Sequence, residues 1–320
     1  MNLKSGIKRT SLLLFLTICH IAARGQQSPL STLSYYIFTP DLYNPAMTGS
    51  KDFFSLGINA SFKGESNTQL ISGNTRLTKS RPGYFSSPQI VEFSNIGVGG
   101  SVFRDVDGLA KNTGISGSFA YHIPLNRQKL SFLSFGAAIK ETYSQISTDT
   151  AGLINSDRKQ YYPNGDLGIY FYSPSFFAGA SAVNILGSPW IPDTSGNYQV
   201  PVWRQYFFNT GFKIVLSKAM NIVLEPSVLI SATDSTFDKI SDNISPIIKL
   251  YLENFCFGTS VSSGDKISFF AQFRYPSFYV GAYYELTNNT AYYKNKPVVE
   301  FTLGLNIMSD KSRIKKSSHW

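Results

Sequence analysis

Three side chains near the middle of the chain have the types and spacing that nucleophilic catalysis would require. Ser116, Ser118 and His122 stand at even-numbered positions of one alternating run, so a strand would place them on one face. A serine nucleophile needs a nearby base such as histidine. Serine is abundant on that face throughout the chain, so the same pattern also fits a polar strand face that performs no chemistry. A hydrolase is therefore one hypothesis among several.

Metal chemistry has few potential ligands. Beyond the first 25 residues, Cys256 is the remaining cysteine, and His122 and His319 are the remaining histidines. Zinc and iron sites usually need several such ligands, and one cysteine forms no intramolecular disulfide. We expect no metal site and no cofactor.

The first 25 residues have the pattern of a secretory signal. Cations precede an apolar run at residues 11–22, and residues 23–25 supply small side chains at the two positions that signal peptidase reads. The mature chain is then expected to begin at Gln26. A lipoprotein signal that ends at Cys19 is the alternative, but Ile18 occupies the position where a small residue is needed.

Most of the positive charge lies at the two ends of the chain. The formal net charge is +9, of which the expected signal contributes four cations and no acid, leaving +5. The tail at residues 309–320 has four cations and Asp310, a net charge of +3, so the body between carries +2. A nucleic-acid partner would favour a clustered basic face, so we predict none.

Two-residue alternation fills the chain from Phe53 almost to its end. Runs such as 54–62, 115–123 and 299–307 have one apolar face and one face of glycine, serine and asparagine. Their length matches the ~9–11 residues of a tilted transmembrane strand. We expect about fourteen strands, which begin near Phe53, Thr68, Phe93, Thr113, Leu130, Gly165, Phe176, Gln205, Met220, Asn243, Phe255, Ile267, Phe278 and Val298.

The pattern predicts an all-β fold, a transmembrane antiparallel β-barrel at residues 53–308. Short links, such as 173–175, alternate with longer ones, such as 144–164, as in barrels with short periplasmic turns and longer outer loops. The even strand count places both termini in the periplasm and leaves no open edge in the bilayer. A soluble β-sandwich is the alternative, but its polar face would carry many more charges.

Charged residues on the small-residue face are expected to point into the barrel. Two interpretations remain open: a polar conduit or ligand pocket, and an interior filled by paired charges and a plug. We favour the second, because the interiors of barrels with few strands tend to be filled. The residues are Lys213, Glu225, Lys249, Arg274, Glu285 and Glu300.

Residues 26–52 precede the first strand and are expected to act as an anchor or plug. Within them, residues 35–50 are rich in aromatic side chains and contain two prolines, which restrict the backbone and favour extended conformations before them. We expect neither a helix nor an alternating strand there. Gly49 would let the backbone turn into the barrel.

The chain resembles the PorP/SprF family of outer-membrane proteins of the type IX secretion system of Bacteroidetes. Residues 36–50, YIFTPDLYNPAMTGS, are similar to the opening motif of that family. Two parts of the chain, the tail at 309–320 and the link at 144–164, match no feature of that family. Further similar segments follow in order at residues 97–103, 112–125, 168–172, 177–184, 224–229 and 278–284.

The resemblance implies an accessory barrel and not an enzyme. Its expected partners are components of type IX secretion or gliding machinery, outer-membrane lipid, and a secreted protein, such as an adhesin, with a type IX C-terminal signal domain. The opening segment would lie at or inside the periplasmic mouth as a plug or as partner contacts. A plug is favoured because its aromatic side chains would otherwise be exposed. The residues concerned are Tyr35, Tyr36, Phe38, Pro40, Tyr43, Asn44, Pro45, Ala46 and Gly49.

An outer-membrane channel for hydrophobic small molecules, similar to long-chain fatty-acid transporters, is the alternative function. Such a channel would have a kinked wall strand beside a continuous apolar pocket. Pro226 lies inside an alternating run and could kink a strand, because proline removes a ladder hydrogen bond.

Overall fold

The computed structural model describes thirteen segments of the chain. Among the described residues, no helix has the length and the apolarity needed to cross a bilayer. The expected signal and the basic tail lie outside the described residues, which are 32–51, 53–64, 66–80, 91–107, 110–126, 129–146, 158–187, 204–234, 236, 243–262, 266–275, 277–287 and 297–307.

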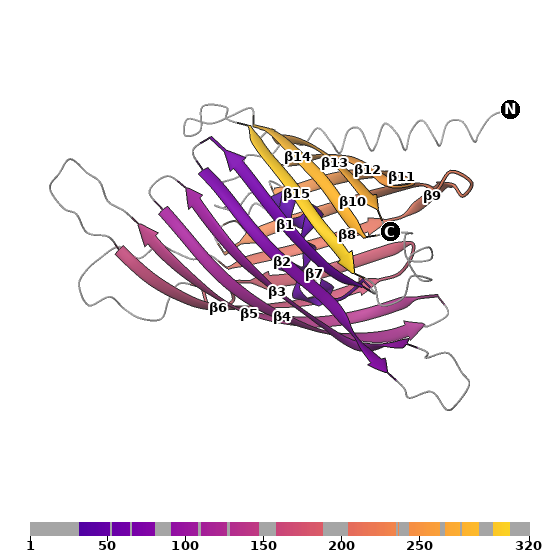
Figure 1. Cartoon of the computed structure of the whole chain (residues 1–320), viewed down its shortest axis with the longest axis horizontal. Coiled ribbons are helices and arrows are strands. Elements are labelled where there is room, and N and C mark those ends of the chain that lie inside the picture. The colour runs from indigo at the N-terminus through magenta and orange to yellow at the C-terminus, as the bar shows by residue number, and fades with distance from the viewer. Residues whose placement is uncertain are drawn as a thin grey trace.

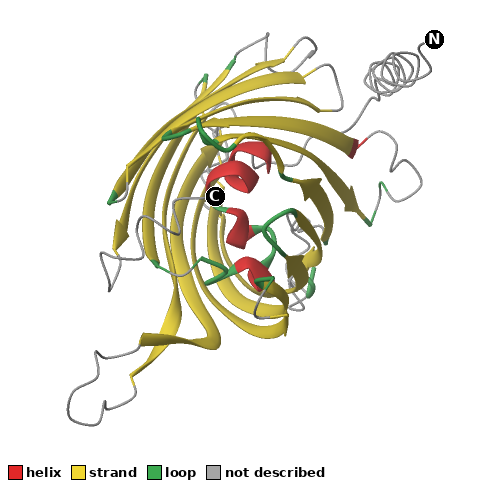
Figure 2. Cartoon of the chain, turned by 90° about the vertical axis from the view of Figure 1, so that its right-hand side faces the viewer, coloured by secondary structure: helices red, strands yellow, loops and turns green. Residues whose placement is uncertain are grey.

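The strands form one antiparallel sheet that closes on itself (Figures 1 and 2). The closing pair joins β1 to β15, from Phe54 opposite Ile307 to Lys63 opposite Val298. The strands are β1 (Phe54–Lys63), β2 (Ser66–Ser80), β3 (Val91–Asp107), β4 (Ala110–Asn126), β5 (Ser131–Ile146), β6 (Arg158–Tyr172), β7 (Phe176–Val183), β8 (Gln205–Phe212), β9 (Ile214–Ser217), β10 (Ile222–Thr233), β11 (Ile244–Leu252), β12 (Phe255–Ser262), β13 (Lys266–Tyr275), β14 (Phe278–Thr287) and β15 (Val298–Ile307).

β8 and β9 are two parts of one barrel strand. Both pair with β10, and the register is the same on either side of the interruption, since Gly211 lies opposite Ser227 and Ile214 lies opposite Leu224; it shifts only at Ser217, opposite Ile222. The interruption falls at Lys213, beside the position of Pro226, which has no N–H to give to the ladder. The ring therefore has fourteen strands, which confirms the predicted barrel and its strand number.

Most strand starts agree with the sequence pattern, and β6 is the exception. β6 begins at Arg158 and not near Gly165, so the link expected at residues 144–164 is shorter at both ends. Tyr161 and Tyr162 place an aromatic ring on each face, and Pro163 follows them, so the alternation is hidden there.

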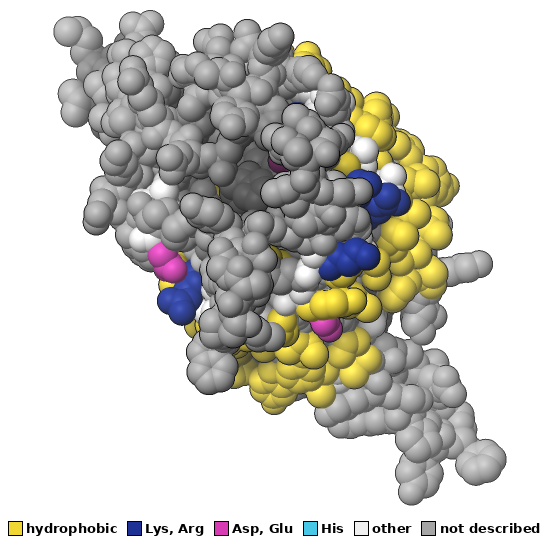
Figure 3. Space-filling view, turned by 90° about the vertical axis from the view of Figure 1, so that its left-hand side faces the viewer, with side chains coloured by type: hydrophobic (Ala, Val, Ile, Leu, Met, Phe, Trp, Pro, Cys, Tyr) yellow, Lys and Arg dark blue, Asp and Glu magenta, His cyan; other side chains and the backbone are white. Residues whose placement is uncertain are grey.

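The apolar face of the barrel points outward and the small or polar face points inward. On β15, Leu303 is 53% exposed and the neighbouring Thr302 is 2% exposed. The same contrast holds on β4, where Phe119 is exposed and His122 is fully buried. Apolar side chains dominate the visible part of the outer wall (Figure 3). A sandwich would bury this face, so the observed arrangement excludes that alternative.

A charge placed on the outer face should test this orientation. We expect Leu303→Arg to lower the free energy of unfolding by about 2–4 kcal/mol in lipid vesicles, because the guanidinium would enter hydrocarbon. Gln69→Arg is the control, since Gln69 lies on the outer face near the start of β2, close to the edge of the bilayer. This substitution should lower the free energy of unfolding by about 0–1 kcal/mol. Equal costs in a urea titration would contradict the assigned bilayer position.

The N-terminal segment, residues 32–51, differs from the sequence prediction in being largely helical. It forms the helix α2 (Thr32–Phe38) and two 3₁₀ turns, η1 (Pro40–Leu42) and η2 (Pro45–Met47). Each turn begins with proline, whose fixed φ suits a first helical position. We attribute α2 to tertiary packing, because an isolated helix this short is unstable in water. Figure 2 shows the three helical elements inside the ring of strands.

Candidate functional site

The N-terminal segment lies directly against the backbone of the barrel wall. The 3₁₀ turn η2 contacts β4, β5 and β6. At Gly136 of β5, an added Cβ atom would overlap the backbone of Pro45 and Ala46. At Gly168 and Gly97 it would overlap the Asn44 side chain and the carbonyl group of Thr48. Inward-facing glycines therefore create the space that the segment occupies.

Hydroxyl and imidazole groups of the wall donate to the carbonyl oxygens of the segment. Ser134 Oγ donates to the carbonyl of Ala46 at 2.7 Å, and Ser181 Oγ donates to that of Tyr43. All four of these residues are buried. A buried carbonyl without a donor costs free energy. These hydrogen bonds therefore fix the position of the segment along the barrel axis.

Asn44 joins the segment to β6 and β7. Its Nδ2 donates to the carbonyl of Ile169 at 3.0 Å and to that of Ala180 at 3.3 Å. Its Oδ1 accepts from the backbone N–H of Ala46 at 3.0 Å, which caps η2. One amide therefore forms the turn and attaches it to the wall, so both its donor and its acceptor are required.

His122 is part of the same contact. Its Nε2 is 2.9 Å from the carbonyl of Thr48, and because a carbonyl only accepts, Nε2 carries the proton. In the neutral ring, Nδ1 then accepts from the Tyr172 hydroxyl at 3.1 Å. Ser118, one of the two candidate nucleophiles, accepts from the Thr48 hydroxyl. The geometry thus gives His122 a positioning role and forms no serine–histidine pair here.

The aromatic side chains of the segment are buried within the lumen. Tyr35, Tyr36, Phe38 and Tyr43 are each 5–7% exposed. The ring of Tyr43 meets that of Phe207 edge-on, with centroids 4.8 Å apart. Burial raises the pKa of the Tyr36 phenol, whose oxygen accepts from the Asn209 amide at 3.1 Å. Asn44, Pro45, Ala46 and Gly49 are buried and Pro40 is partly buried, so eight of the nine candidate residues are buried.

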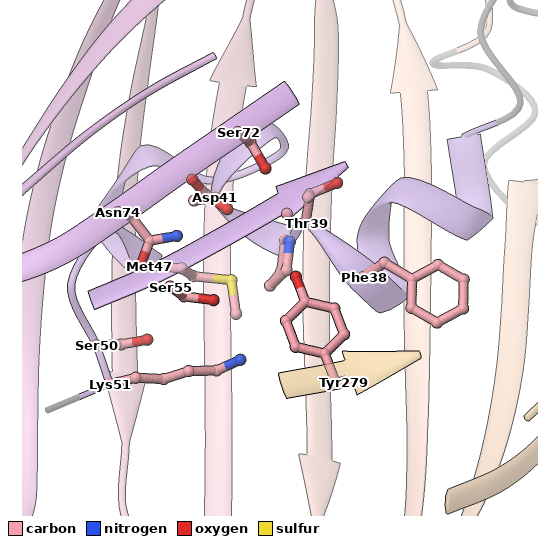
Figure 4. A pocket seen from close by; sticks show the side chains of 12 residues that line it. Phe38, Thr39, Asp41, Met47, Ser50, Lys51, Ser55, Ser72, Asn74 and Tyr279 are labelled. Atoms are coloured by element: carbon pink, nitrogen blue, oxygen red, sulfur yellow. The ribbon is translucent and has the colours of Figure 1, made fainter. Parts of the chain in front are cut away.

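A small cavity of about 30 Å³ lies between the segment and β1, β2 and β14 (Figure 4). Asp41, Lys51 and Tyr279 line it, together with Asn74. Burial raises the pKa of the Asp41 carboxyl. Removal from water is the main cause that lowers the pKa of Lys51, and the Arg274 cation adds to it. The side chain keeps contact with solvent, which limits the shift. The cavity is thus polar, and one acidic and one basic side chain line it.

The structure places the six candidate lumen charges on the inward face of the wall. Glu225 of β10 is 3% exposed and accepts from Lys249 Nζ and from the Tyr251 hydroxyl, each at 3.1 Å. Lys213 Nζ lies 3.9 Å from the same carboxylate. Lys249 Nζ also lies 5.8 Å from the centroid of the Tyr36 ring, which brings this group into contact with the N-terminal segment.

The other three charges lie on β13, β14 and β15. Arg274 Nη2 is 3.5 Å from the Gln272 side-chain oxygen, and Glu285 accepts from the Tyr283 hydroxyl at 2.6 Å. Glu300 is fully buried opposite Ser61 of β1. The six residues therefore do not form one site, and only Lys213, Glu225 and Lys249 lie in direct contact.

Sequence reasoning missed the wall residues that receive the segment. Asp41 and Lys51 also lay outside the predicted set, although they line the cavity. One pattern in the sequence could have predicted the wall residues: small inward-facing residues recur at the same height along the barrel axis on neighbouring strands. The residues are Gly97, Ser134, Gly136, Gly168, Gly179 and Ser181.

Replacing Asn44 with aspartate tests the attachment with almost no change in shape. Asn44→Asp keeps the acceptor for Ala46 but turns a donor into an acceptor that faces two carbonyl oxygens. We expect docking of the segment to weaken by about 1–3 kcal/mol, because buried carbonyls lose their partner. Protease cleavage within residues 32–51 should accelerate while the barrel stays folded. An unchanged cleavage rate would contradict the role assigned to the amide.

The closed ring, its apolar outer face and its inward polar face define an outer-membrane β-barrel with an N-terminal segment inside it. The family described as "Type IX secretion system membrane protein PorP/SprF" matches residues 24–305. The chain therefore belongs to the PorP/SprF family of type IX secretion membrane proteins. A search of curated proteins found no match.

Solved outer-membrane proteins are similar at low identity. Omp33 of Acinetobacter baumannii is 10% identical with a TM-score of 0.41, over 81% of this chain and 100% of that one. CdiB of the same species is 9% identical with a TM-score of 0.37, over 79% of this chain and 60% of that one. BamA of Haemophilus ducreyi is 11% identical with a TM-score of 0.36, over 79% and 70%. All three scores lie below 0.5, and we infer nothing further from them.

Proposed function

We propose that this protein is an accessory barrel of type IX secretion that binds exported or surface-attached proteins and envelope components of the secretion or gliding machinery. The family match over residues 24–305 carries the proposal. The N-terminal segment favours a binding protein rather than an open channel, because its aromatic side chains occupy space in the lumen. We further propose that both termini face the periplasm and that the protein performs no enzymatic reaction.

Affinity purification from gently solubilised outer membranes tests this proposal. An epitope-tagged protein should recover type IX components or a secreted protein with a type IX C-terminal domain, identified by mass spectrometry. Clean deletion, in a strain without a redundant paralogue, should reduce surface display of the cargo. Normal display, together with recovery of the barrel alone, would refute the proposal.

Transport of hydrophobic molecules receives less support from the described residues. The strand interruption beside Pro226 is the kind of feature such a channel would use. However, the lumen beside it holds Glu225, Lys213 and Lys249, so this part of the interior is charged. A hydrophobic ligand would have to displace the water and counter-charges that stabilise these groups.

A further inference from the structure

The two mouths of the lumen carry opposite net charges among the described residues. The end with the short turns holds five cations and two carboxylates, a formal net charge of +3: Lys51, Arg76, Lys213, Lys249, Arg274, Asp41 and Glu225. The end with the long loops holds two cations and four carboxylates, a formal net charge of −2: Lys63, Lys266, Asp105, Asp107, Glu285 and Glu300. Lys140 and Asp166 form an ion pair at 2.8 Å between them.

We propose that the short-turn mouth of the lumen is a binding site for an acidic polypeptide segment of a partner protein. The proposal deepens, and rests on, the proposed function as a partner-binding barrel. In the orientation given above this mouth faces the periplasm, so the partner is an envelope component of the machinery. Complementary charge guides the approach of such a segment and selects against basic ones.

The cations at this mouth differ in how far they reach solvent, and Lys213 and Lys249 already share the Glu225 carboxylate. Lys51 is exposed, and the side chains of Lys213 and Lys249 are 20% and 13% exposed. Lys51 and the Tyr279 ring point into the same space in Figure 4. Arg274 is paired in register with Tyr279 on the adjacent strand, which brings its guanidinium to the same side of the mouth. Guanidinium and phenol groups at one mouth suit carboxylate recognition.

The position of these cations favours a polypeptide over a lipid headgroup. These cations face the lumen, on the opposite side of the wall from the lipid-facing residues such as Phe212 and Val280. A lipid headgroup would have to leave the bilayer and pass around the rim to reach them. An extended polypeptide enters a barrel mouth without that cost.

The rim of the same mouth is also basic. Its described turns carry Lys129 and Lys218 against Glu253.

Binding of a fluorescent ten-residue polyglutamate to the purified full chain tests the proposal. We expect anisotropy to show binding of polyglutamate at low salt, no binding of polyserine, and loss of the signal as salt rises. The double variant K51Q/R274Q should bind about tenfold more weakly, because two charge contacts are lost. The matched variant K63Q/K266Q, at the opposite mouth, should bind as the wild type does. Heat-dependent migration in gels verifies that each barrel is folded.

Two further results separate the possible explanations. Binding that disappears in nanodiscs containing phosphatidylglycerol would assign the site to lipid headgroups and overturn the proposal. Equal polyglutamate binding by K51Q/R274Q and wild type would overturn it as well.

Affinity purification distinguishes this proposal from the proposed function. K51Q/R274Q should lose an envelope partner that K63Q/K266Q retains. If wild type and K51Q/R274Q recover the same type IX components in equal amounts, the acidic site is wrong and the proposed function stands. If the wild type recovers none, the proposed function itself fails.

Discussion

Replacing Gly136 with valine is expected to release the N-terminal segment from the barrel wall. A side chain at this position would overlap the backbone of Pro45 and Ala46, and backbone atoms cannot rotate away as a flexible side chain does. Overpacking of this kind costs about 1–3 kcal/mol. Cleavage of residues 32–51 by protease should therefore be about 10–100-fold faster, since cleavage follows the population of the open form.

Gly117→Val is the matched control for this experiment. Gly117 lies on the outward face of the neighbouring strand β4, and an added Cβ there meets no atom within 4 Å. Valine is favoured in strands and in contact with lipid, so the variant should behave as the wild type does. Equal protease sensitivity of the two variants would show that Gly136 does not hold space for the segment.

The fold was predictable because the barrel wall obeys a strict local rule. Each outward residue meets lipid and each inward residue meets the lumen, so the two-residue period survives along every strand. The rule failed where it was broken locally. Tyr161 and Tyr162 place aromatic rings on both faces near the start of β6, so the sequence pattern predicts a start seven residues too late.

The helical turns of the N-terminal segment could not be predicted, because no local pattern specifies them. Residues 32–38 have no acidic residue in the first turn and no basic residue in the last. Their conformation is set by the walls around them, through burial of Tyr35 and Phe38. The same holds for Asn44, whose partners on β6 and β7 lie 125 and 136 residues away.

The inward charges illustrate a limit of parity arguments. Alternation predicts which face of the sheet a residue occupies, but it does not predict which residue of the neighbouring strand lies opposite to it. Glu225 and Lys249 are adjacent because the register of β10 and β11 pairs them. That register depends on the link between the strands, part of which lies outside the described residues. Grouping the six charges by contact therefore required the three-dimensional ladder.

Replacing Glu225 with glutamine is expected to lower the free energy of unfolding by about 3–5 kcal/mol, because it leaves buried cations without their counter-charge. Glu225 is 3% exposed and bonds to Lys249 and Tyr251, with Lys213 at 3.9 Å. Glutamine keeps the shape and one acceptor for the Tyr251 hydroxyl. The loss therefore measures charge and not volume, and urea titration in detergent, followed by fluorescence, records it.

Two companion variants give this prediction its specificity. Asp234→Asn breaks an ion pair with Arg204 at 3.9 Å whose side chains are 41% and 50% exposed, so it should cost less than about 1 kcal/mol. Adding Lys249→Met to the E225Q chain should restore part of the lost stability, because it removes one uncompensated cation. If the second substitution lowers stability further, and E225Q alone costs no more than Asp234→Asn, then Glu225 is solvated and not the centre of a charge network.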